Sequence, residues 1–255
     1  MSSKLQIGWV LAAAWLALAA PALAGSATNR IFALRAEAAF HRTQAIYLAA
    51  TNSATNALRY AQACFDLAGF ATNEARRAEI ARLGIVACRQ WVARESNSAP
   101  GHYFLGMNLG QLARAEAPSL AAYRLVYEIE REFLAAAGLD ARVGNAGPAR
   151  ALGELYFRAP GWPLSVGSNR KAREWLGRAV ALAPDYPDNL LDLAEAQLKW
   201  RQREEAKATL DKLEALWPVA KTNLAGESWG PFWADWEPRR AALKADYQRV
   251  YGPKP

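Results

Sequence analysis

The sequence is poor in the side chains that most often carry chemistry. It has two cysteines and two histidines in 255 residues. His41 and His102 lie far apart, without neighbours at metal-ligand spacing, so each is expected to be an ordinary surface or loop residue. No serine lies in a nucleophile-elbow pattern, and Gly106–Gly110 lacks the lysine and strand of a phosphate-binding loop. We therefore expect no metal, no cofactor and no enzyme activity.

Runs of β-branched residues are also scarce, which argues against a sheet. Alanine, leucine, arginine and glutamate dominate, and these residues favour helix. About half of the chain is apolar (52%), enough for one continuous helical core or for two modest domains. The composition predicts an all-α fold.

Long runs of basic residues are missing as well. The formal net charge is +7, but the excess is spread along helices in pairs such as Arg76-Arg77 and Arg239-Arg240. This distribution is typical of solvated helix faces and unlike a nucleic-acid-binding patch.

The first 24 residues resemble an export signal. Lys4 is the only charge before Gly25, Ile7–Ala20 is apolar, and Ala22–Ala24 offers small residues for cleavage. The apolar run is short for a membrane span, and no cysteine follows for lipid attachment. We predict a cleaved signal, no stable membrane anchor and export to the periplasm, with an uncleaved anchor as the alternative.

Cys64 and Cys88 could pair in an oxidising compartment. They are expected on consecutive antiparallel helices, about eight and sixteen residues from the turn, which gives an axial offset of roughly 12 Å. That offset exceeds disulfide reach, so two buried thiols are expected.

Apolar periodicity and punctuation by glycine and proline predict about ten helices. Gly69 is expected to end the second helix in a left-handed conformation. A turn-rich connection is expected over 138–147, and the aromatic segment Ser228–Trp236 is not expected to be a regular helix. The expected helices cover 28–50, 54–68, 73–95, a pair from 100 to 138 broken at Pro118, 148–158, 170–183, a pair from 187 to 218, and 238–251.

Small and large apolar residues recur with a spacing that resembles the thirty-four-residue tetratricopeptide pattern. The resemblance covers Tyr103–Pro218. It implies an α-solenoid of antiparallel helix pairs over residues 25–227, capped by residues 228–255. The last unit carries it on Leu190, Leu193, Ala194, Gln197, Ala206, Leu210, Leu213 and Pro218.

A narrower likeness rests on Gly147–Gly153, Ala159–Pro163, Gly167 and Ala183–Pro187. These segments resemble the periplasmic T component of TRAP-type transporters and its uncharacterised tetratricopeptide relatives. The likeness implies an internal pocket or channel and partnership with a periplasmic solute-binding protein. Members are often lipoproteins, whereas this chain lacks the acylated cysteine.

The loop Ala159–Ser168 interrupts the repeat where a tight turn is usual. Prolines stiffen it, glycines permit unusual turns, and Trp162 adds a large amphipathic surface. Binding loops on rigid scaffolds have this composition. The alternative is that Trp162 folds inward and fills space beneath the longer turn.

Other candidates follow from tryptophan enrichment and from the repeat. Trp229, Trp233 and Trp236 could line a groove or cap the array. On the first helix of the last repeat, Asp188, Leu191, Glu195 and Leu198 are expected to face the concave side. The candidate ligand- or partner-binding residues are Trp162, Arg150, Tyr156, Asn169, Asp188, Leu191, Glu195, Trp229, Trp233 and Trp236.

The sequence thus predicts an exported, non-enzymatic helical-repeat protein. It would bind a partner protein as a scaffold, or handle an apolar small molecule as an accessory. The alternatives are a TRAP-transporter T component and a structural assembly factor of the cell envelope.

Overall fold

The computed structural model describes residues 27–252, so the predicted signal peptide 1–24 lies outside the described residues. The described part contains ten α-helices and one short 3-10 helix, which confirms the predicted all-α fold. In chain order the elements are α2 (Ala27–Ala49), α3 (Ala54–Gly69), α4 (Glu74–Arg94), α5 (Ala99–Glu116), α6 (Leu120–Leu139), α7 (Val143–Arg158), α8 (Asn169–Leu182), α9 (Pro187–Lys199), α10 (Arg203–Asn223), η1 (Glu227–Trp229) and α11 (Gly230–Tyr251).

Short polar side chains fix the start of half of these helices. In each case the side chain accepts a hydrogen bond from the backbone N–H three residues later. The capping residues are Ser53, Asn73, Ser98, Ser119 and Ser168. These caps satisfy N–H groups that have no partner within the helix, and the predicted start at Asn73 is confirmed.

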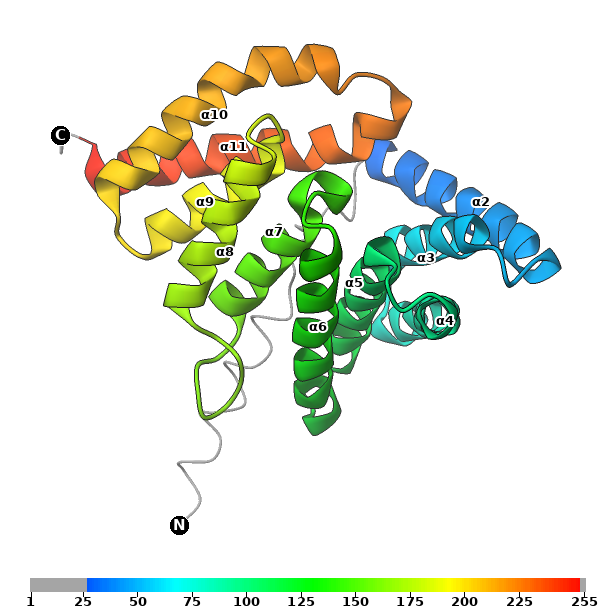
Figure 1. Ribbon diagram of the computed structural model, residues 1–255. Helices are drawn as coiled ribbons and strands as arrows, with labels where there is room; N and C mark the ends of the chain where they lie inside the picture. Colours follow the sequence, from blue (N-terminus) through cyan, green and yellow to red (C-terminus); the bar gives the residue numbers. More distant parts are fainter. Residues whose placement is uncertain (1–26, 253–255) are drawn as a thin grey trace.

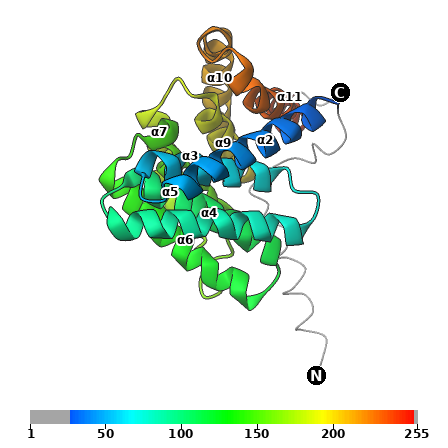
Figure 2. The same cartoon turned by 90° about the vertical axis from the view of Figure 1, so that its right-hand side faces the viewer.

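Consecutive helices pack as antiparallel pairs, and the pairs stack in sequence (Figure 1). The first helices of successive pairs, α3, α5, α7 and α9, also contact one another. The view turned by 90° shows the α3–α6 layer in front and α10 with α11 at the top (Figure 2). This arrangement is the predicted tetratricopeptide-like array.

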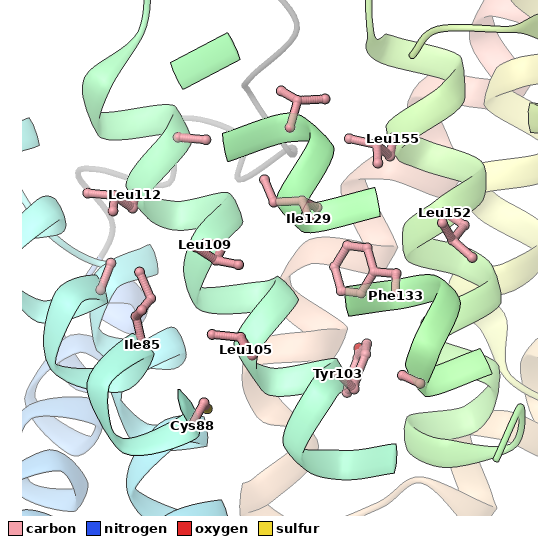
Figure 3. Close-up of a cluster of buried hydrophobic side chains, with 14 of the residues drawn as sticks. Ile85, Cys88, Tyr103, Leu105, Leu109, Leu112, Ile129, Phe133, Leu152 and Leu155 are labelled. Atoms are coloured by element: carbon pink, nitrogen blue, oxygen red, sulfur yellow. The ribbon is translucent and has the colours of Figure 1, made fainter. Parts of the chain in front are cut away.

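One buried cluster runs through α3 to α8 and includes Leu109, Phe133 and Leu152 (Figure 3). Glycine allows close approach within it, because a Cβ on Gly106 would collide with the ring of Phe133 and one on Gly153 with Leu176. The small residues expected at the helix crossings therefore have the packing role that the repeat pattern predicts.

Cys64 and Cys88 are both free and buried, as predicted. Burial raises the pKa of the Cys64 thiol to about 12 and also raises the pKa of Cys88. Both thiols are therefore neutral packing groups at ordinary pH.

The boundary prediction at Gly69 is wrong. Gly69 is the last residue of α3 and has no positive φ, and the cap that follows it, Phe70, is right-handed. Pro218 lies on the second helix of the last repeat, as predicted, and this helix, α10, continues to Asn223.

The aromatic segment Ser228–Trp236 is also more regular than predicted. Only its start is a 3-10 helix, and α11 begins at Gly230. Pro231 lies in the first turn, where its missing N–H costs nothing. The buried indole of Trp236 then anchors this turn in the core that α11 shares with α9 and α10.

α11 joins the two ends of the array. It packs along α9, and its beginning lies against the beginning of α2 (Figure 1). A Cβ on Gly230 would lie 3.1 Å from the ring of Phe32, and Arg35 pairs with Glu227 at 3.3 Å. The predicted cap is thus a helix that spans from the last repeat to the first helix. No helix in residues 27–252 is long and apolar enough to cross a membrane.

Candidate functional site

The α7–α8 loop is braced by its own backbone. The N–H of Gly167 donates to the carbonyl of Pro160 at 2.9 Å, and the N–H of Ser168 donates to the carbonyl of Tyr156 at 2.9 Å. Gly161 and Gly167 form a bridge across the loop. A Cβ on Gly167 would overlap the carbonyl of Ala159, so this close approach requires glycine.

Trp162 lies at the outer part of this loop and is 89% exposed. The inward-folded alternative for Trp162 is therefore wrong. Leu164 is 67% exposed, whereas Ser165 is buried. The loop projects beyond α7 and α8 (Figure 1). It presents a large apolar side chain to solvent on a fixed backbone.

Below the loop, the expected candidates Tyr156 and Asn169 have internal partners. Tyr156 is buried and donates to Glu130 at 2.6 Å. Asn169, the first residue of α8, accepts from the indole N–H of Trp200 at 3.0 Å. The ring of Trp200 also contacts Phe157 edge to face. These contacts tie the start of α8 to the end of α9.

A buried network of charges lies where α7, α9 and α11 meet. Five carboxylates face three guanidiniums over this area, and most of these side chains are largely buried. The members are Arg150, Glu154 and Arg158 on α7, Asp188, Asp192 and Glu195 on α9, and Asp235 and Arg239 on α11.

Arg239 is the centre of the network. Its guanidinium lies 2.8 Å from Asp188 and 3.2 Å from Asp235, and it also binds Asp192. Arg150 reaches Asp188 at 3.4 Å and stacks over the ring of Tyr186 at 5.1 Å. Arg150, Asp188 and Glu195 therefore hold helices together in this structure and are not presented to solvent.

Carboxylates outnumber guanidiniums in the network, and burial raises the pKa of Glu154 and of Asp192. One oxygen of Glu154 and one of Asp235 are buried without a hydrogen-bond partner. The raised pKa values of Glu154 and Asp192 favour proton binding at these two buried carboxyls.

Residues 144–146 place a carbonyl group beside this network. Gly144, Asn145 and Ala146 have left-handed backbone conformations, which interrupt α7 before its regular part. The carbonyl of Asn145 accepts from Asn189 at 3.2 Å and from Arg150 at 3.3 Å. These bonds hold a conformation that asparagine and alanine rarely adopt. The connection predicted over 138–147 is therefore a specific left-handed turn.

The concave stripe on α9 differs from the one expected. Leu191 is fully buried in the core with α10 and α11, and Asp192 is buried in the charge network. The signal for the network was present in the sequence. Charged residues recur every three or four positions on the facing helices: Arg150, Glu154 and Arg158; Asp188, Asp192 and Glu195; Asp235 and Arg239.

The C-terminal tryptophans are packed together rather than spread along a groove. Trp236 is 1% exposed and contacts Trp233 edge to face. Trp233 contacts Trp217 in the same way and donates to the carbonyl of Leu224 at 2.7 Å. Trp229 lies at the edge of this cluster, against Tyr186 and Trp236. These contacts place the three indoles in or against the core that α9, α10 and α11 share, and capping of the array stays a prediction.

His102 is more enclosed than the sequence indicated. Its Nδ1 lies 2.6 Å from a Glu132 oxygen and its Nε2 lies 3.0 Å from the carbonyl of Ser96, on a side chain that is 13% exposed. The expectation of an ordinary surface residue is wrong for His102. The same expectation fits His41, which is 62% exposed. Over residues 27–252, no group of three or more histidine, cysteine, aspartate or glutamate residues is placed to hold a metal ion.

A tetratricopeptide repeat family matches residues 164–216. The match runs from the α7–α8 loop through α8 and α9 into α10. None of the curated proteins compared with the chain matches it. The comparisons support a tetratricopeptide repeat region, a class of repeat that typically forms protein-binding surfaces. They give no link to the T component of TRAP-type transporters.

Proposed function

We propose that the protein is an exported, non-enzymatic scaffold that binds a partner protein through the α7–α8 loop, with Trp162 as the anchor. The observation that carries the proposal is the 89% exposure of an indole on a braced loop. The repeat match in residues 164–216 supports a protein partner.

Exposed tryptophan on a rigid loop is well suited to recognition. A tryptophan buries about 150–250 Å² when it is covered, and tryptophans dominate binding hot spots. The bridge between Gly161 and Gly167 fixes the backbone before binding, so little conformational entropy is lost when a partner docks. Leu164, 67% exposed, adds apolar area beside the indole.

The concave side of the last repeat is a weaker candidate. Its charged stripe, Asp188, Asp192 and Glu195, is engaged by Arg239 of α11. A peptide could reach these carboxylates only after α11 had been displaced. Partner binding is therefore assigned to the loop.

Site-specific photo-crosslinking tests the proposal. A photoreactive phenylalanine analogue replaces Trp162 in the cells that produce the protein, and a matched control carries it at Val219, a residue of α10 that is 54% exposed. We expect discrete protein adducts at position 162 and none of these at 219. Equal adduct patterns at the two positions would contradict the proposal.

Export rests on the first 24 residues and has its own test. We expect the protein recovered from the periplasmic fraction to begin at Gly25, as read by intact mass or N-terminal sequencing. An unprocessed chain in the cytoplasmic fraction would contradict export and leave the loop proposal standing. Native mass spectrometry of the same sample tests the alternative of a carried apolar small molecule.

A further inference from the structure

We infer that the loop and the exposed basic residues beside it form one surface that binds an acidic segment of the partner protein. We call it the loop-end surface: Trp162, Leu164, Arg170, Arg173, Lys199 and Arg201. The inference rests on the proposed function and adds the chemistry of the partner.

The described backbone brings these residues to one end of the array. Trp162 follows Gly161, which is bridged to Gly167, and Arg170 lies only three residues beyond Gly167. The bond between the Trp200 indole and Asn169 then places the end of α9 beside the first turn of α8. Lys199 and Arg201 flank Trp200 in the chain and are exposed.

This surface carries cations without carboxylate partners. Arg170, Arg173, Lys199 and Arg201 are exposed, and none is in an ion pair within residues 27–252. Elsewhere on the molecule arginines are commonly paired, as Arg82 is with Glu116 at 2.7 Å.

The acidic residues near this surface are few. The only acidic residue of α8 is Glu174. The first turn of α10 carries Glu204 and Glu205, and Arg203 in the same turn lies 3.8 Å from Glu204. The unpaired positive charge therefore complements a partner with excess carboxylates.

One of the arginines is held in place before binding. The guanidinium of Arg173 stacks over Trp200 at 4.7 Å, and Trp200 is itself fixed by Asn169. A planar guanidinium in a fixed position suits bidentate pairing with a carboxylate. These features favour an acidic protein segment over the mobile phosphates of a lipid surface.

The test moves the photoreactive residue to Leu164 in the full chain and leaves Trp162 intact. One variant carries Arg170→Glu and Arg173→Glu. The matched control carries Arg42→Glu and Arg59→Glu, which reverse two exposed arginines on α2 and α3. Circular dichroism confirms that both variants keep their helix content. Mass spectrometry maps the partner peptide in the adduct.

We expect the loop-end variant to lower the adduct yield about tenfold, through loss of two charge-assisted contacts, and the control to leave it unchanged. The crosslinked peptide should be rich in aspartate and glutamate. An unchanged yield, or a neutral or basic peptide, overturns the inference while the loop proposal survives. Absence of adducts at both 162 and 164 overturns both.

A parallel arm uses the purified mature protein with phosphatidylcholine vesicles, with and without phosphatidylglycerol. We expect no co-sedimentation with either. Binding that requires the anionic lipid, and that Arg170→Glu with Arg173→Glu abolishes, would reassign the loop-end surface to membranes and overturn the acidic-segment inference.

Discussion

Arg201 stands at the end of α9 in the left-handed conformation that glycine adopts without strain. For an L-residue this conformation costs about 1–2 kcal/mol, while glycine loses about 0.5–1 kcal/mol in chain entropy. We therefore expect Arg201→Gly to raise the free energy of unfolding by about 0.5–1 kcal/mol, measured by urea denaturation. Arg201→Ala keeps the strain and should give no gain. Equal effects of the two substitutions would show that the backbone at Arg201 is unstrained.

Alanine substitutions at two glycines, one before α8 and one within it, should have opposite effects on stability. A methyl group on Gly167 would overlap the carbonyl of Ala159, so Gly167→Ala should destabilise the protein by about 1–3 kcal/mol. A methyl group on Gly177 in α8 would meet no other atom within 4 Å, so Gly177→Ala should stabilise the protein by about 0.5–1 kcal/mol. Thermal unfolding of the two variants checks the sign. Tolerance of alanine at 167 would mean that the loop is not held as described.

At this scale the sequence identified residue types better than their orientation. The prolines and glycines located the loop around Trp162. They did not show in which direction the indole points. That direction depends on the bonds from Gly167 and Ser168 back to the loop start and α7. Leu191 was expected on the concave side, whereas it is fully buried and its neighbour Asp192 pairs with Arg239. The offset is small because adjacent helix residues differ by about 100° around the axis.

The element that most changes the expected binding mode is α11. It packs along α9 of the last repeat and connects to it through Arg239. Removing one partner of a buried ion pair leaves the other charges unpaired, so Arg239→Ala should cost about 3–5 kcal/mol. Arg240 is the matched control, because its pair with Glu214 at 2.5 Å is partly exposed and should contribute about 1 kcal/mol. Urea denaturation measures both. A smaller loss at 239 than at 240 would refute the anchoring role.

The stability that the network between α9 and α11 contributes should also depend on pH. Burial holds the folded pKa of Asp192 above its unfolded value, so the proton binds more tightly in the folded state. The stability that Asp192 contributes by binding this proton is complete below the unfolded pKa, about 4, and is lost as pH rises through the folded pKa. Wild type should therefore lose stability relative to Asp192→Asn as pH increases from about 4 to 8. Denaturation curves across that range test this, and a relative gain by the wild type would mean that the folded pKa is lowered.

Helix positions could largely be predicted because caps and breakers are local. Asn73, Ser98 and Ser168 act within one turn. The error at Ser228–Trp236 has the opposite cause. Gly230 and Pro231 look like breakers in the sequence, but the helix there is stabilised by burial of Trp236 against distant residues such as Tyr186. Tertiary packing of this kind cannot be deduced from local propensity.

Over the whole molecule, α11 links the last repeat to α2 and leaves the α7–α8 loop projecting from the array (Figure 1). The antiparallel pairs could be predicted because their periodicity is repeated. The closure by α11 could not, because it depends on contacts such as Phe32 with Gly230, two residues that lie near opposite ends of the chain. The result is a rigid frame that holds one apolar loop beside a basic surface.

Partner retention decides whether Trp162 anchors a partner protein. Tagged wild type, Trp162→Ala and Val219→Ala are purified from the producing cells and compared by quantitative mass spectrometry. A hot-spot tryptophan contributes at least about 2 kcal/mol, or roughly thirtyfold in affinity. We predict that the partner crosslinked at position 162 is lost from Trp162→Ala and kept by wild type and Val219→Ala. Equal retention of that partner by all three proteins would contradict the anchoring role of Trp162.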